Sequence, residues 1–169
     1  MTCPDPGQYR LLANYNQWAN RRLIGASGRL TPEQLTKDRG AFFTSLLGTF
    51  NHMLVADRIW LWRLTGEGET YDRLDIGLFT DLDAFAAARE AEDTRIIAYA
   101  RALTAEALAA DYSYKNMAGA EQIRPLHYSV THFFNHQTHH RGQVHGLLSG
   151  FGLSPPSLDL VVYYADAGL

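Results

Sequence analysis

One stretch decides how this sequence folds: residues 126–151, LHYSVTHFFNHQTHHRGQVHGLLSGF. It follows Pro125, contains no proline of its own, and runs to a glycine at position 150 or 152. Along it, apolar and histidine residues recur at steps of three and four, which places them on one face of a helix. The residues on this face are Phe133, His136, His140, Val144, Leu147 and Phe151. The stretch therefore predicts a long amphipathic helix with two histidines inside its apolar stripe.

Three further long helices are predicted before this one. They share the same periodicity and cover residues 8–29, 44–64 and 80–110. The second is apolar on most of its circumference, which indicates a central helix that is largely buried. The third ends earlier, at Leu103, if Thr104 begins a separate short helix.

The rest of the chain connects or follows these helices. Residues 112–116 and 122–124 can pair as a small hairpin across residues 117–120. The tail from Ser154 to Tyr164 opens with two prolines, a poor helix start, and is expected to pack along the bundle surface. Since there is no internal repeat or linker, we expect a single domain over residues 1–169. Its fold class is all-α, a four-helix bundle with a short β-hairpin between helices 3 and 4.

The composition excludes several classes of protein. The formal net charge is −3 with acids and bases interspersed, which argues against a nucleic acid as the main partner. No stretch of about 18 apolar residues is present, so we expect no membrane span. The N-terminus does not resemble a signal peptide, and Cys3 is the only cysteine, which fits a reducing cytoplasm. A metal site in this chain would be built from imidazole, carboxylate and water.

The histidines in the apolar stripe point to such a site. His136 and His140 are four residues apart, so they lie about 40° apart around a helix and about 6 Å apart along it, and can reach one ion together. A third ligand should come from another helix, and His52 is the candidate in the second helix, on a small, apolar face. Three imidazoles with an open position are typical of catalytic zinc sites, although imidazole also suits nickel, cobalt and iron(II). The alternative is a metal-free bundle in which these histidines are hydrogen-bonded core groups.

Other polar residues are weaker candidates for a role in the metal site. The remaining four histidines are interpreted as structural or as groups that orient a ligand, namely His127, His132, His139 and His145. Three acids in the middle of predicted helices could orient a ligand or a substrate, namely Asp57, Glu92 and Asp93. Acids in such positions are more often charged groups exposed to solvent. The three tryptophans are interpreted as core or interface aromatics.

Residues 132–143, HFFNHQTHHRGQ, resemble the HxxNHxxHHRGQ signature of the DinB family of four-helix-bundle metalloproteins, which are related to YfiT-like proteins. Residues 51–60, NHMLVADRIW, are similar to the family's second-helix histidine segment. Weaker likenesses at residues 15–20 and 152–164 extend the resemblance over almost the whole chain. It implies an up-down-down-up topology with a long connection, frequent homodimers, and a metal triad formed by His52, His136 and His140.

Family members of known activity are thiol-dependent transferases or isomerases that use bacillithiol, mycothiol or glutathione-like cofactors. The resemblance therefore implies an enzyme, a thiol S-transferase or hydrolase acting on a small electrophilic molecule. One divalent metal ion would activate the thiol or water. Zinc and nickel are the preferred candidates for this ion, and iron, cobalt and manganese are the alternatives. The second hypothesis is a metal-binding scaffold or sensor without turnover, in which a residue such as Glu92 or Asp93 closes the site.

Overall fold

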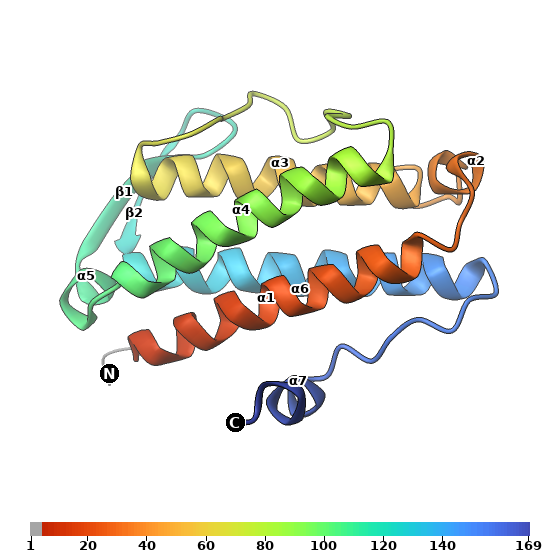
Figure 1. The fold of residues 1–169 in the computed structure, drawn as a ribbon. Helices are drawn as coiled ribbons and strands as arrows, with labels where there is room; N and C mark the ends of the chain where they lie inside the picture. The colour runs from red at the N-terminus through yellow and green to blue at the C-terminus, as the bar shows by residue number, and fades with distance from the viewer. Residues whose placement is uncertain (1–4) are drawn as a thin grey trace.

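The computed structural model describes residues 5–169, so Cys3 lies outside the described part of the chain. Four long helices lie side by side (Figure 1), and they are α1 (Pro6–Ser27), α3 (Leu46–Thr65), α4 (Leu82–Ala102) and α6 (Leu126–Gly150). Helices α1 and α6 run in one direction and α3 and α4 in the other. Helices α3 and α4 are parallel because the long loop that joins them runs back along the bundle. The predicted fold class, an up-down-down-up four-helix bundle, is confirmed.

Four of the shorter elements lie at the ends of the bundle, and the last in the chain packs against the side of α1. They are α2 (Pro32–Thr36), α5 (Ala105–Ala109), β1 (Asp111–Lys115), β2 (Glu121–Pro125) and α7 (Leu160–Ala167). Thr104 begins α5 as a separate helix, because its hydroxyl accepts the backbone N–H of Ala107 at 3.1 Å. Strands β1 and β2 pair antiparallel, with Asp111 opposite Pro125, so the predicted hairpin is confirmed with slightly longer strands.

The C-terminal tail differs from the expectation in one respect. It packs along the bundle surface, but it is helical from Leu160 onward despite the prolines before it. Tyr163 explains this, because its ring packs against the rings of Tyr15 and Trp18 on α1, at centroid distances of 5.8 and 5.5 Å. Tertiary contacts thus stabilise a helix whose local sequence favours it only weakly.

The described residues form three apolar clusters, a small one that joins α7 to α1 and two larger ones, one toward each end of the bundle. One of the larger clusters includes Trp60, Ile96 and Phe133, and the other includes Leu23, Phe50, Phe85 and Leu148. Helix α3 contributes to both and is buried over most of its length, as its apolar circumference predicted. Of the described helices, none is long and apolar enough to cross a membrane.

A layer of buried polar side chains separates the two larger clusters. Asp57 on α3 accepts a hydrogen bond from Arg89 on α4 at 2.6 Å, and Arg89 also lies 3.1 Å from Asp93. The Asp93 carboxylate in turn accepts the side-chain amides of Asn16 and Asn20 on α1. The expectation of solvated charge is therefore wrong for these acids, because each is paired with a cation or an amide inside the bundle.

Candidate metal centre

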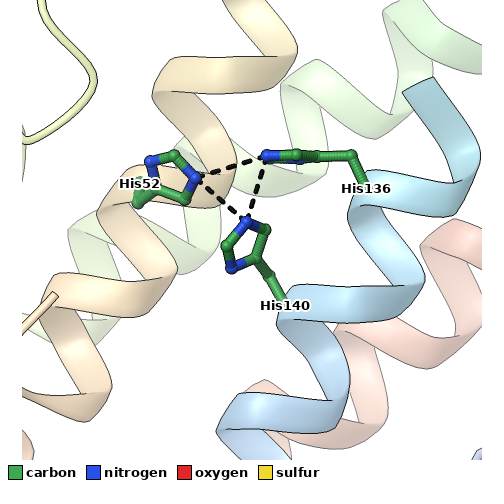
Figure 2. A group of neighbouring side chains, drawn as sticks. All are labelled: His52, His136 and His140. Atoms are coloured by element: carbon green, nitrogen blue, oxygen red, sulfur yellow. Dashed lines mark hydrogen bonds between the residues drawn. The ribbon is translucent and has the colours of Figure 1, made fainter. Parts of the chain in front are cut away.

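The structure brings together the three histidines that the sequence selected. Figure 2 shows His52 projecting from α3 toward His136 and His140, which lie one turn apart on α6. The Nε2 atoms are 3.0 Å apart between His136 and His140, 3.1 Å between His52 and His140, and 3.4 Å between His52 and His136. Among residues 5–169, these side chains form the one cluster of His, Cys, Asp or Glu that could hold a metal ion.

The spacing of the three nitrogens fits a metal ion. Zinc–imidazole bonds are about 2.0–2.1 Å long, so two ligands at a tetrahedral angle lie about 3.3 Å apart. Ligands at the right angle of an octahedral site lie about 2.9 Å apart by the same arithmetic. The observed separations of 3.0 to 3.4 Å lie close to this range, and they therefore suit tetrahedral zinc and octahedral nickel or iron(II) alike.

Hydrogen bonds on the far side of two rings fix which nitrogen carries a proton. Nδ1 of His52 lies 2.9 Å from the carbonyl oxygen of Leu74, and Nδ1 of His140 lies 2.7 Å from Oε1 of Gln143. Because both oxygens only accept, each Nδ1 donates its hydrogen, and each neutral ring then has a bare lone pair on Nε2. These two lone pairs are only 3.1 Å apart and repel one another unless a cation or a shared proton lies between them.

Burial keeps the three rings neutral. Burial, with a smaller contribution from the neighbouring histidines, lowers the pKa of His136 to about 3 and that of His140 to about 4. Burial also lowers the pKa of His52. Neutral imidazole is the form that binds metal, so the site can do so at neutral pH without first losing protons.

The loop before α3 covers one side of the cluster. The ring of Phe43 stacks on His52 with a centroid distance of 3.7 Å and planes 13° apart, and it meets His140 edge-on. Thr44 has a positive φ of 64°, which a non-glycine residue rarely adopts. Gly48 allows the loop to approach α3, because a Cβ there would lie 2.1 Å from the carbonyl oxygen of Phe43.

Comparison with known proteins agrees with the fold. A family model described as the DinB family matches residues 5–167. The chain belongs to the DinB family. A DinB-like protein from Bacillus cereus ATCC 10987, solved by crystallography, is similar in fold, with a TM-score of 0.64 and 24% sequence identity over 85% of this chain and 91% of that one. None of the curated proteins matches this sequence.

A small pocket adjoins the histidine cluster of this DinB-family chain. It has a volume of about 270 Å³, and His136 forms part of its wall together with residues of α3, α6 and the hairpin. His132 lies in the same wall and is therefore next to the site. The sequence alone had not determined the position of His132 relative to the site. His139 lies outside the cluster, exposed, with its Nε2 at 3.2 Å from the side-chain amide of Gln143. His127 stacks on Tyr128, and His145 lines a different pocket.

The acids considered as a fourth ligand have other partners. Glu92 forms an ion pair with Arg95 at 2.8 Å, and Asp93 belongs to the buried polar layer with Arg89. Sequence reasoning missed three residues of the site, Leu74, Gln143 and Phe43. Gln143 follows His140 by three residues, a spacing that places both on one helix face, whereas no pattern in the loop predicted that Phe43 would stack on His52.

Proposed function

We propose that this chain binds one divalent metal ion through His52, His136 and His140 and is an enzyme that acts on a small electrophile. The observation that carries the proposal is the pair of Nε2 lone pairs that face each other across 3.1 Å. A divalent ion held there would supply Lewis acidity, which lowers the pKa of a neighbouring thiol or water. The imidazole ligands favour zinc or nickel, with iron(II), cobalt and manganese as further candidates.

The surrounding residues support this function through position and charge. Leu74 and Gln143 hold two of the rings in the orientation that aims Nε2 at the centre of the cluster. Phe43 shields His52 from solvent on one side. Three neutral ligands would leave the full charge of the ion in place, which is the condition for strong activation of a nucleophile.

The pocket beside His136 favours an enzyme over a scaffold, because a protein that only stores or senses metal has no need of a substrate cavity. The choice of a low-molecular-weight thiol as the nucleophile rests on the family alone, as does a homodimer. A cytoplasmic location is proposed from the single cysteine of the chain.

Activity of metal-reconstituted protein tests the proposal. The tag-free chain, stripped of metal and then loaded with zinc or nickel, is assayed with bacillithiol, mycothiol or glutathione and chlorodinitrobenzene, and separately for hydrolysis of nitrophenyl acetate. We expect turnover that requires metal, disappears in His136→Ala and survives in His145→Ala. Stoichiometric metal with no turnover for any pair would instead favour the metal-binding scaffold.

A further inference from the structure

The pocket beside His136 contains a single charged side chain. Its wall is formed largely by apolar and aromatic residues, among them Trp60 on α3 and Tyr114 on β1. Arg63, in the last turn of α3, also lines it. Arg63 is the one arginine, lysine, aspartate or glutamate among the residues of the wall.

The Arg63 guanidinium rests on aromatic faces rather than on an acid. Its Cζ lies 4.9 Å from the ring centroid of Trp60 and 5.4 Å from that of Tyr114, and Nη2 lies 3.4 Å from the sulfur of Met117. No ion pair between described residues includes Arg63. Arg58, one and a half turns earlier on the same helix, is by contrast paired with Glu69 and Glu92.

The hairpin holds this arrangement in place. The hydroxyl of Tyr112 on β1 donates to the backbone carbonyl of Arg63 at 2.6 Å, which fixes the strand against the end of α3. Tyr114, two residues along, then lies on the same face of the strand and stacks on Tyr112, with ring centroids 5.8 Å apart. The favourable interaction of a cation with a helix C-terminus accounts for the position of Arg63 on α3, but it does not require this aromatic enclosure.

The field inside the pocket is therefore positive. Arg63 and His132 both contact the Trp60 ring, with the Arg63 Cζ 4.9 Å and the His132 ring centroid 5.1 Å from the Trp60 centroid, so the guanidinium lies close to the histidines of the wall. A guanidinium presents a planar fork of N–H donors that matches a carboxylate, and flat aromatic walls suit a planar or apolar body. A volume of about 270 Å³ restricts the ligand to a small molecule.

We infer that this pocket binds the carboxylate of a small, largely apolar acid, with Arg63 as the group that recognises it. The inference rests on the proposed function, because only that function places a metal ion beside this ligand. It names the class of substrate that the metal site would act on. The carboxylate belongs either to the electrophile or to the thiol, and the chemistry of recognition is the same for both.

Calorimetric titration of the tag-free chain, with and without zinc, separates these sources. Benzoate is compared with benzamide, and mercaptoacetate with mercaptoacetamide, so that each acid has a neutral partner of the same shape. We expect the acid of at least one pair to bind about tenfold or more tightly than its amide. A preference confined to benzoate assigns the carboxylate to the electrophile, and a preference confined to mercaptoacetate assigns it to the thiol.

Variants identify the residue responsible. Arg63→Gln should remove the preference for the acid, and Arg63→Lys should retain part of it, because the charge remains without the fork. Arg101→Gln is the matched control, since Arg101 is an exposed arginine in the last turn of α4. The zinc content of Arg63→Gln, measured by mass spectrometry, should equal that of the unaltered chain.

Equal binding of acid and amide in both pairs would overturn the inference, as would a preference that survives in Arg63→Gln. The two proposals fail separately. A chain that takes up no metal but still prefers the acid through Arg63 contradicts the metal proposal alone, and a chain that holds zinc without any preference contradicts the carboxylate pocket alone.

Discussion

At the residue scale, the chemistry of the site depends on the groups that hold the far side of each imidazole. Gln143 accepts the Nδ1 hydrogen of His140 at 2.7 Å and so keeps the Nε2 lone pair directed at the cluster. Partners of this kind orient ligand rings and raise their basicity, and removing one costs about tenfold to a hundredfold in metal affinity.

We therefore expect Gln143→Leu to weaken zinc binding by about tenfold to a hundredfold without altering the helical content of the chain. Competition with a chromophoric chelator measures the affinity. Gln8→Leu, at an exposed glutamine of α1, is the control and should bind zinc as the unaltered chain does. Equal affinity for the two variants would mean that Gln143 does not orient His140.

The lowered pKa values of His136 and His140 predict how stability of the metal-free chain changes with pH. Both pKa values, about 3 and about 4, lie below the ordinary value of about 6.5. Between about pH 4 and pH 6.5, the unfolded chain therefore binds more protons than the folded chain. The free energy of unfolding should therefore fall as pH decreases from about 6.5 toward 4.

Asp57 opposes this trend, because burial raises its pKa to about 7, and a raised acid pKa adds stability as pH decreases from about 7 toward 4. The measurement is consequently a comparison by urea unfolding at several pH values. We expect the acid-induced loss of stability to be smaller in His136→Gln than in the unaltered chain. The same slope in both proteins would show that His136 is not buried as a neutral ring.

Sequence patterns identified the residues of the site where helix periodicity applies. His136 and His140 follow from their place in the apolar stripe of α6, and His52 from being the histidine on a small, apolar face of α3. Phe43 could not be predicted in this way, because its contact with His52 depends on a loop whose course is set by Thr44 and Gly48. Periodicity carries no information about such a loop.

At the element scale, the junction between this loop and α3 leaves no room for a side chain at Gly48. The Ser45 side chain caps α3 by accepting the N–H of Gly48 at 3.0 Å, and the carbonyl of Phe43 lies against the same glycine. A methyl group at position 48 would have to displace loop backbone rather than a flexible side chain.

We expect Gly48→Ala to destabilise the chain by about 1–3 kcal/mol, as overpacking of a close contact does. Urea unfolding provides the measurement. Gly146→Ala on α6 is the matched control, since a Cβ there meets nothing within 4 Å and alanine favours a helix by up to about 1 kcal/mol. A Gly48→Ala chain as stable as the control would contradict the close approach of the loop.

The helices themselves were largely predictable, and the exceptions have a physical cause. Thr104 and Asp81 act as the N-caps that their residue types indicate. Helix α7 was not expected, because it is held by the packing of Tyr163 on α1, a contact between residues far apart in the sequence. Local propensity decides an element only where tertiary contacts do not override it.

At the scale of the whole molecule, the bundle is organised as an apolar cluster, a polar layer and a second apolar cluster. The polar layer links all four long helices through Asp57, Arg89, Asp93, Asn16 and Arg141, whose side chain donates to Asn16. The sequence could not reveal this layer, because the pairing of Asp57 with Arg89 depends on which helices are neighbours.

Arg89→Met should destabilise the fold strongly, by about 3–5 kcal/mol, because it leaves the carboxylates of Asp57 and Asp93 buried without a cation. Arg21→Met is the control, since the Arg21–Glu90 pair is about half exposed and worth about 0–1 kcal/mol. Chemical unfolding of both variants checks the difference. Similar losses for the two would mean that the buried layer contributes no more than a surface ion pair.

The metal content of the protein tests the three-histidine site most directly. Tag-free chain is incubated with zinc or nickel, freed of excess ion, and analysed by inductively coupled plasma mass spectrometry. We expect one ion per chain, none in His140→Ala with the helical circular dichroism unchanged, and one in His145→Ala. A wild-type chain that stays substoichiometric after incubation with either ion, or a His140→Ala chain that keeps its full complement, would contradict the site.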